Sequence, residues 1–189
     1  MTHEEFIKVL DEKGYSYEIK GDLIIVTRKG HVWLESLTSL PPGVEFKNGG
    51  NVYLSSLTSL PPDVVFNNVL DVNLNALTSL PPDVEFNNGD AVNLDALTSL
   101  PPGMEFKNGG SVYLNALTSL PHDVGFKNGA SVWLVSLTSL PPSVEFNNRG
   151  DVHLRSLIGG WFNFWKGNIE GIGSNRLLNK MIELGLFDR

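Results

Sequence analysis

The sequence predicts a mainly β fold, a parallel β-solenoid whose coils are each 20 residues long. A segment that reads NVYLSSLTSLPPDVVFNN from residue 51 returns every 20 residues, with no insertion or deletion between copies. Each copy holds two short apolar–polar alternations, Val-x-Leu and Val-x-Phe, which are typical of half-buried strands. Pro-Pro and Asn-Gly pairs, which form turns, separate them. The leading valines are Val32, Val52, Val72, Val92, Val112, Val132 and Val152.

Because the copies have equal length, residues 20 apart are expected to lie about 4.8 Å apart on neighbouring coils. The expected interior columns are Leu34 to Leu154, Leu37 to Leu157, Leu40 to Leu140 and Phe46 to Phe146. Proline cannot donate a sheet hydrogen bond, so the prolines are expected at corners. The small residues from Ser36 to Ser156 are expected at a tight inward corner. The asparagines from Asn48 to Asn148 are expected to form a buried ladder, bonded to backbone groups and to the amides above and below.

Residues 1–31 are expected to form an N-terminal α/β cap, because a solenoid has unpaired strand edges at its ends. Thr2 stands three residues before Glu5, the spacing of a capping box at a helix start. Apolar residues follow at helical spacing as far as Gly14, and two strands then flank a Gly21-Asp22 turn.

The solenoid is assigned to residues 32–157, as six full copies and a partial seventh, and a helical C-terminal cap to residues 158–189. In this cap an aromatic cluster is expected to plug the last coil. Ser174 is expected to begin a helix whose apolar stripe ends at Gly185. The clustered aromatic residues are Trp161, Phe162, Phe164 and Trp165.

The run LTSLPP resembles the leucine-rich repeats of the short, 20-residue type found in secreted bacterial effectors. The resemblance covers residues 32–157 and departs from the family in one respect. The family pattern LxLxxNxL has asparagine three residues after the second leucine, whereas Leu54 is followed by Ser-Ser-Leu. A curved horseshoe and a straighter β-solenoid therefore both stay open. The resemblance implies a bacterial or phage origin and a protein partner bound along a strand face.

The composition and charge of the chain exclude or disfavour several classes of function. The chain has 189 residues, a net charge of −7 and no cysteine, which excludes disulfides, thiolate ligands and cysteine nucleophiles. Residues 32–157 hold twelve acidic and five basic residues, so direct nucleic-acid binding is disfavoured. No apolar run approaches the about 18 residues of a membrane span, and the N-terminal segment lacks the apolar core of a secretory signal. We therefore expect a cytoplasmic location and no membrane partner.

No pattern of catalytic or metal-binding residues stands out, so no enzyme activity and no cofactor are predicted. The four histidines share no ligand spacing, and the carboxylates vary freely between copies, which leaves no placed acid–base pair. The one visible break in the repeat is Val65 together with Val69-Leu70. It is interpreted as a packing variant or a local contact spot.

The candidate binding site is the outward position between the two buried residues of each first strand. Its members are Trp33, Tyr53, Asn73, Asn93, Tyr113, Trp133 and His153. A row of aromatic and amide side chains suits a partner protein or a glycan; alternatively, the aromatics simply favour exposed strands. The first six members read the same in both directions, which suggests a homodimer in which two copies pair face to face and antiparallel.

The leading expectation is a non-enzymatic solenoid that recognises or inhibits a protein partner through this column. The alternatives are a glycan-binding or self-associating structural protein, and an acidic DNA mimic that inhibits a nucleic-acid-binding enzyme. The mimic rests on a second outward column that runs from Glu45 to Glu145. Duplex DNA carries one charge per about 1.7 Å, far denser than this column. The threonine that recurs every 20 residues could indicate ice binding, but an ice-binding surface would need a second row of threonines parallel to the first.

Overall fold

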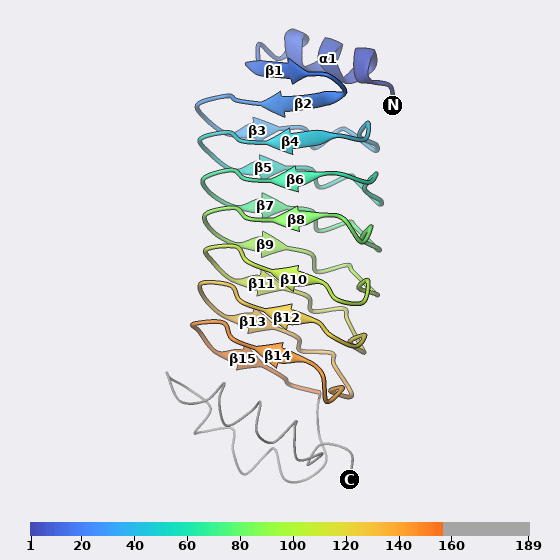
Figure 1. Ribbon diagram of the computed structural model, residues 1–189, viewed down its shortest axis with the longest axis vertical. Coiled ribbons are helices and arrows are strands. Elements are labelled where there is room, and N and C mark those ends of the chain that lie inside the picture. Colours follow the sequence, from blue (N-terminus) through green and yellow to red (C-terminus); the bar gives the residue numbers. More distant parts are fainter. Residues whose placement is uncertain (157–189) are drawn as a thin grey trace.

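The computed structural model describes residues 1–156, and these form a column of stacked coils with one short helix at the N-terminal end (Figure 1). Helix α1 spans His3–Glu12, and β1 (Tyr17–Lys20) and β2 (Leu23–Val26) form an antiparallel hairpin. The coils follow one another with little curvature, so the straighter of the two expected solenoid shapes is the one observed. Leu157 and the expected C-terminal cap lie outside the described residues.

The first strands of the coils form one seven-stranded parallel sheet. Its strands are β3 (Val32–Trp33), β5 (Val52–Tyr53), β7 (Val72–Asn73), β9 (Val92–Asn93), β11 (Val112–Tyr113), β13 (Val132–Trp133) and β15 (Val152–His153). Every pairing joins residues 20 apart, for example Val32 with Val52. The predicted register is therefore confirmed.

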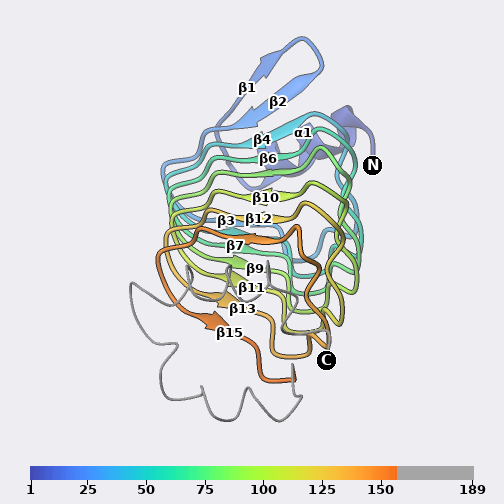
Figure 2. The same cartoon turned by 60° about the horizontal axis from the view of Figure 1, so that its bottom comes forward.

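The second strands line the opposite face of each coil (Figure 2). They are β4 (Val44–Phe46), β6 (Val65–Phe66), β8 (Glu85–Phe86), β10 (Glu105–Phe106), β12 (Gly125–Phe126) and β14 (Glu145–Phe146). Strand β2 pairs in parallel with β4, again 20 residues apart, so the hairpin of the cap continues this sheet by one further coil. Because no strand within residues 1–156 contains proline, the prolines lie at the corners, as predicted.

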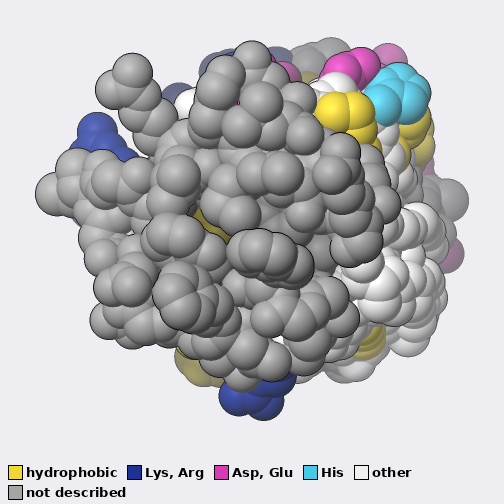
Figure 3. Space-filling model, turned by 90° about the horizontal axis from the view of Figure 1, so that it is seen from below, with side chains coloured by type: hydrophobic (Ala, Val, Ile, Leu, Met, Phe, Trp, Pro, Cys, Tyr) yellow, Lys and Arg dark blue, Asp and Glu magenta, His cyan; other side chains and the backbone are white. Residues whose placement is uncertain are grey.

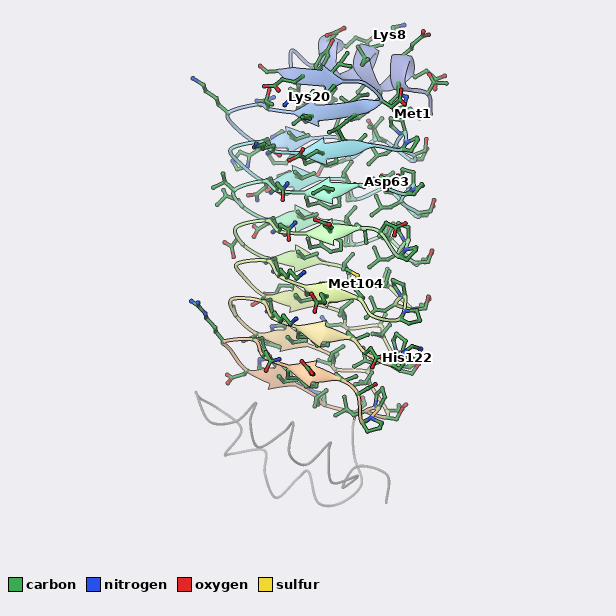
Figure 4. All side chains as sticks on the ribbon, in the orientation of Figure 1. Met1, Lys8, Lys20, Asp63, Met104 and His122 are labelled. Atoms are coloured by element: carbon green, nitrogen blue, oxygen red, sulfur yellow. The ribbon has the colours of Figure 1, made fainter. Side chains whose placement is uncertain are left out.

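The sheet of second strands is broken between β8 and β10, which are not hydrogen-bonded to each other. Position 104 holds methionine where the equivalent positions of the other full copies hold valine, and Met104 lies at the level of the break (Figure 4). Met104 is buried, and its longer side chain needs more depth than valine. The Phe86 and Phe106 rings stand 5.9 Å apart across the break, against 5.2 Å for Phe66 and Phe86.

The core lies between the two sheets and consists of the predicted columns of leucine, valine and phenylalanine. The phenylalanines of neighbouring coils stack with nearly parallel rings. At the N-terminal end, Phe6 and Leu10 of α1 are fully buried and cover the first coil. The hydroxyl of Tyr15 accepts a hydrogen bond from the Trp33 N–H at 3.1 Å, which satisfies a donor on the edge of β3.

Two details differ from the sequence-based expectations. The small residues from Ser36 to Ser156 are half-buried or exposed in the turn after the first strand, so they do not form an inward corner. The buried asparagines do not bond one another. Asn48 Nδ2 donates instead to the carbonyls of Gly30, Gly50 and Asn51 at 2.9 to 3.3 Å, and later copies repeat this pattern. The column thus fastens each turn to the preceding coil through the backbone.

Candidate binding face

The outward side chains of the seven-stranded sheet form a continuous surface three residues wide. Alternate residues of a strand point to the same side, so positions 31, 33 and 35 and their equivalents every 20 residues, up to 155, share this surface. We call it the aromatic face. Trp33 is 43% exposed, and the other members of its column are half-buried.

The aromatic members of the central column form two separate stacks. Near the N-terminal end, the rings of Trp33 and Tyr53 lie 4.1 Å apart and 13° from parallel. Near the C-terminal end, Trp133 lies between Tyr113 at 5.9 Å and His153 at 3.6 Å. The structure therefore places all seven candidate residues in one row, as the sequence predicted, but the row of rings is interrupted.

Asn73 and Asn93 occupy the interruption. The Asn73 Oδ1 accepts a hydrogen bond from the backbone of Asn75 at 3.3 Å, and the Asn93 Oδ1 accepts one from the backbone of Asp95 at 3.1 Å. Within residues 1–156, neither Nδ2 group has a hydrogen-bond acceptor. These two amides therefore offer free donors on a half-buried surface.

Because asparagine is shorter than tyrosine or tryptophan, a groove of about 400 Å³ lies between Tyr53 and Tyr113. This volume is within the range of about 300–1,000 Å³ that is usual for ligand sites. The groove is lined by Asn51, Tyr53, Asp71, Val72, Asn73, Asp90, Ala91, Asn93 and Tyr113. It contains carboxylates, amides and aromatic rings but no basic side chain.

Hydrogen bonds fix one wall of the groove. The Asp71 carboxylate accepts from the Ala91 N–H at 3.1 Å and from Asn51 Nδ2 at 3.3 Å. Asn51 Nδ2 also donates to the Tyr53 hydroxyl at 2.7 Å. Asn51, Asp71 and Asp90 are site residues that the repeat pattern did not predict. The period-two alternation could have placed the first two on this face, whereas Asp90 lies in a turn that no strand pattern covers.

The opposite face, built on the second strands, has its carboxylates engaged with neighbours. Glu105 pairs with Lys107 at 2.7 Å and with Lys127. Hydrogen bonds from Lys107 and then from Lys127 lower the pKa of Glu105 to about 2, and the same contact raises the pKa of Lys107. Figure 3 shows the molecule from its C-terminal end. At the edge of this view, where described residues are visible, acidic side chains lie beside a histidine and hydrophobic side chains.

The histidines do not converge on a reactive site. His31 Nδ1 accepts from the Asn51 N–H at 3.0 Å, and His122 contacts the neighbouring Asp123 at 2.8 Å. Within residues 1–156, no group of three or more histidine, aspartate or glutamate side chains is arranged to hold a metal ion. In the same part of the chain, no helix has the length and apolar character needed to cross a membrane.

Comparison with known proteins gives no match, whether with family models, curated proteins or solved structures.

Proposed function

We propose that this protein is a non-enzymatic binding protein of the cytoplasm that recognises a protein partner through the aromatic face. The observation that carries the proposal is the groove between Tyr53 and Tyr113, where rings, free amide donors and carboxylates meet on one rigid sheet. Tyrosine and tryptophan supply large contact areas at low entropic cost, and asparagine and serine supply adaptable hydrogen bonds. The rings of the aromatic face are already ordered by stacking, so binding immobilises few side chains.

The size of the face indicates what kind of protein surface it fits. Seven coils span about 29 Å and three alternate residues span about 13 Å, which gives an outline of about 400 Å². A standard interface buries about 800 Å² on each partner. The aromatic face alone therefore suits an extended segment of a partner better than a broad globular surface.

The proposal is tested by capturing proteins from a host lysate with the immobilised chain and with the variant Tyr113→Ala/Trp133→Ala. We expect the variant to lose the captured partner while circular dichroism shows that it stays folded. Asn87→Ala, on the opposite face, is the matched control and should retain the partner. If the wild type and the aromatic variant capture the same proteins, the aromatic face is not the binding site.

A second copy of the chain is the other candidate partner. When one copy is turned end for end about an axis parallel to its strands, the Trp33–Trp133 row faces itself in reverse order. The same rotation sets Asp71 opposite Ala91, so these carboxylates do not face each other. Light scattering after size exclusion measures this directly, and a monomer at high micromolar concentration would rule out self-association.

The observed surface does not favour the DNA mimic. The second outward column is interrupted by Val65 and Gly125, and Glu105 is neutralised by two lysines. A continuous row of free charges, which a mimic of the phosphate backbone needs, is not formed.

A further inference from the structure

We infer that the groove accepts two arginine side chains, in the spacing Arg-x-Arg, from an extended basic segment of the partner. This inference rests on the proposed function and names the chemistry of its partner. Three features of the groove lead to it: the tyrosine rings at its two ends, the carboxylates that have no basic partner in the groove, and the free amide donors.

Asn73 and Asn93 lie between the two tyrosines in the column, and the longer tyrosine rings extend beyond these amides at the two ends of the groove. Tyr53 is covered by Trp33 on one side and Tyr113 by Trp133, so the second face of each ring turns toward the groove. Three coil steps separate the rings, about 14 Å. A planar cation such as guanidinium stacks well on such a face.

The distances fit two planar groups. If each stacks about 3.5–4.0 Å from its tyrosine, about 7 Å is left between their planes. Alternate side chains of an extended segment point the same way and are about 6.8 Å apart. A segment that runs along the solenoid axis with arginines at alternate positions therefore places one guanidinium on each tyrosine.

The charges of the groove select a cation. Asp71 and Asp90 contribute carboxylates, and none of the lining residues is basic. Arg155 is the only arginine or lysine on the aromatic face. Arginine donates two parallel hydrogen bonds to a carboxylate, a geometry that lysine lacks. Phosphate-bearing ligands are repelled by the same carboxylates.

The free amides of Asn73 and Asn93 indicate a peptide rather than a small cation. A guanidinium has donors only and cannot satisfy another donor. The main-chain carbonyls of an extended segment supply the acceptors that the two Nδ2 groups lack.

The test uses fluorescence polarisation with the full chain and short labelled peptides flanked by glycine and serine. An Arg-x-Arg peptide is expected to bind roughly tenfold more tightly than a Lys-x-Lys or Arg-x-x-Arg peptide. The variant Asp71→Asn/Asp90→Asn, which removes both negative charges and keeps one acceptor oxygen at each position, should lose binding by roughly tenfold or more. The control Asp83→Asn alters an exposed carboxylate away from the groove and should change nothing.

Equal binding of the Lys-x-Lys peptide, or wild-type affinity in the Asp71→Asn/Asp90→Asn variant, would overturn the arginine site. Failure of every peptide to bind would overturn it as well, and so would binding of a neutral oligosaccharide in their place. The proposed function is judged separately. If the lysate partner still depends on Tyr113 and Trp133 while the peptides fail, the face binds a protein of different chemistry.

Discussion

Asn88 shows how one buried side chain holds two coils together. Its Nδ2 donates to the carbonyls of Leu70, Asp90 and Ala91 at 2.8 to 3.1 Å. Its Oδ1 is buried without a partner among the described residues. Residues of this column therefore act as donors, which explains why the repeat keeps an amide there and uses neither aspartate nor an apolar residue.

Replacing this amide should be costly. In Asn88→Ala, carbonyls of two coils each lose one of their donors and a buried amide is removed, so we expect the free energy of unfolding to fall by about 1–3 kcal/mol. Urea denaturation followed by circular dichroism measures it. Asn87→Ala is the matched control, because the Asn87 side chain is exposed and, within residues 1–156, bonds only Glu85; it should change stability by less than about 0.5 kcal/mol. Equal losses in the two variants would contradict the assigned role.

At the scale of the strands, the break between β8 and β10 should be visible in the dynamics. Within the described residues, the backbone N–H groups of Glu105 and Lys107 have no backbone acceptor. The equivalent groups one coil later do: Gly125 N–H bonds Met104 at 2.9 Å and Lys127 N–H bonds Phe106 at 2.9 Å. Local opening therefore needs fewer broken bonds at the break.

Hydrogen exchange measured by NMR should show faster exchange for the amides of Glu105 and Lys107 than for those of Gly125 and Lys127, by roughly tenfold or more. Met104→Val should let the coils approach and slow exchange at the break. Equal protection at the two levels would show that the ladder is continuous.

Pairing between neighbouring coils also makes stability depend on pH. The pKa of Glu105 is about 2 in the folded chain, below its ordinary value of 4.5. Its contribution is therefore fully present above about pH 4.5 and is lost as the pH falls toward 2. In Glu105→Gln, the acid-induced loss of stability over this window should shrink, by less than about 1 kcal/mol because the side chain is 36% exposed.

Urea denaturation at pH 7 and at several values between 4.5 and 2.5 measures the effect. Glu145→Gln, whose carboxylate has no ion pair within residues 1–156, serves as the control. A pH profile of Glu105→Gln that is parallel to that of the wild type would contradict the assigned pKa.

At the scale of the whole molecule, the exact period made most of the fold predictable. Once the leucines of each copy are known to be 20 residues apart, the register, the core columns and the row from Trp33 to His153 follow. The break between β8 and β10 was not predictable. A single methionine among valines does not indicate whether the neighbouring side chains rearrange around it or the two coils move apart. The groove was not predicted either. It arises from the length difference between Asn73 and the tyrosines, and from Asp90 in a turn outside any strand pattern.

The central claim is that residues 20 apart lie one coil apart along a straight axis. Because the chain has no cysteine, pairs of introduced cysteines can carry spin labels without interference. Thr38 is exposed, as are Thr98, Thr118 and Thr138. Pulsed electron paramagnetic resonance on Thr38→Cys combined with Thr98→Cys, Thr118→Cys or Thr138→Cys should give distances that increase by about 4.8 Å per coil, near 14, 19 and 24 Å. Distances that do not increase with the number of intervening coils would contradict the claim.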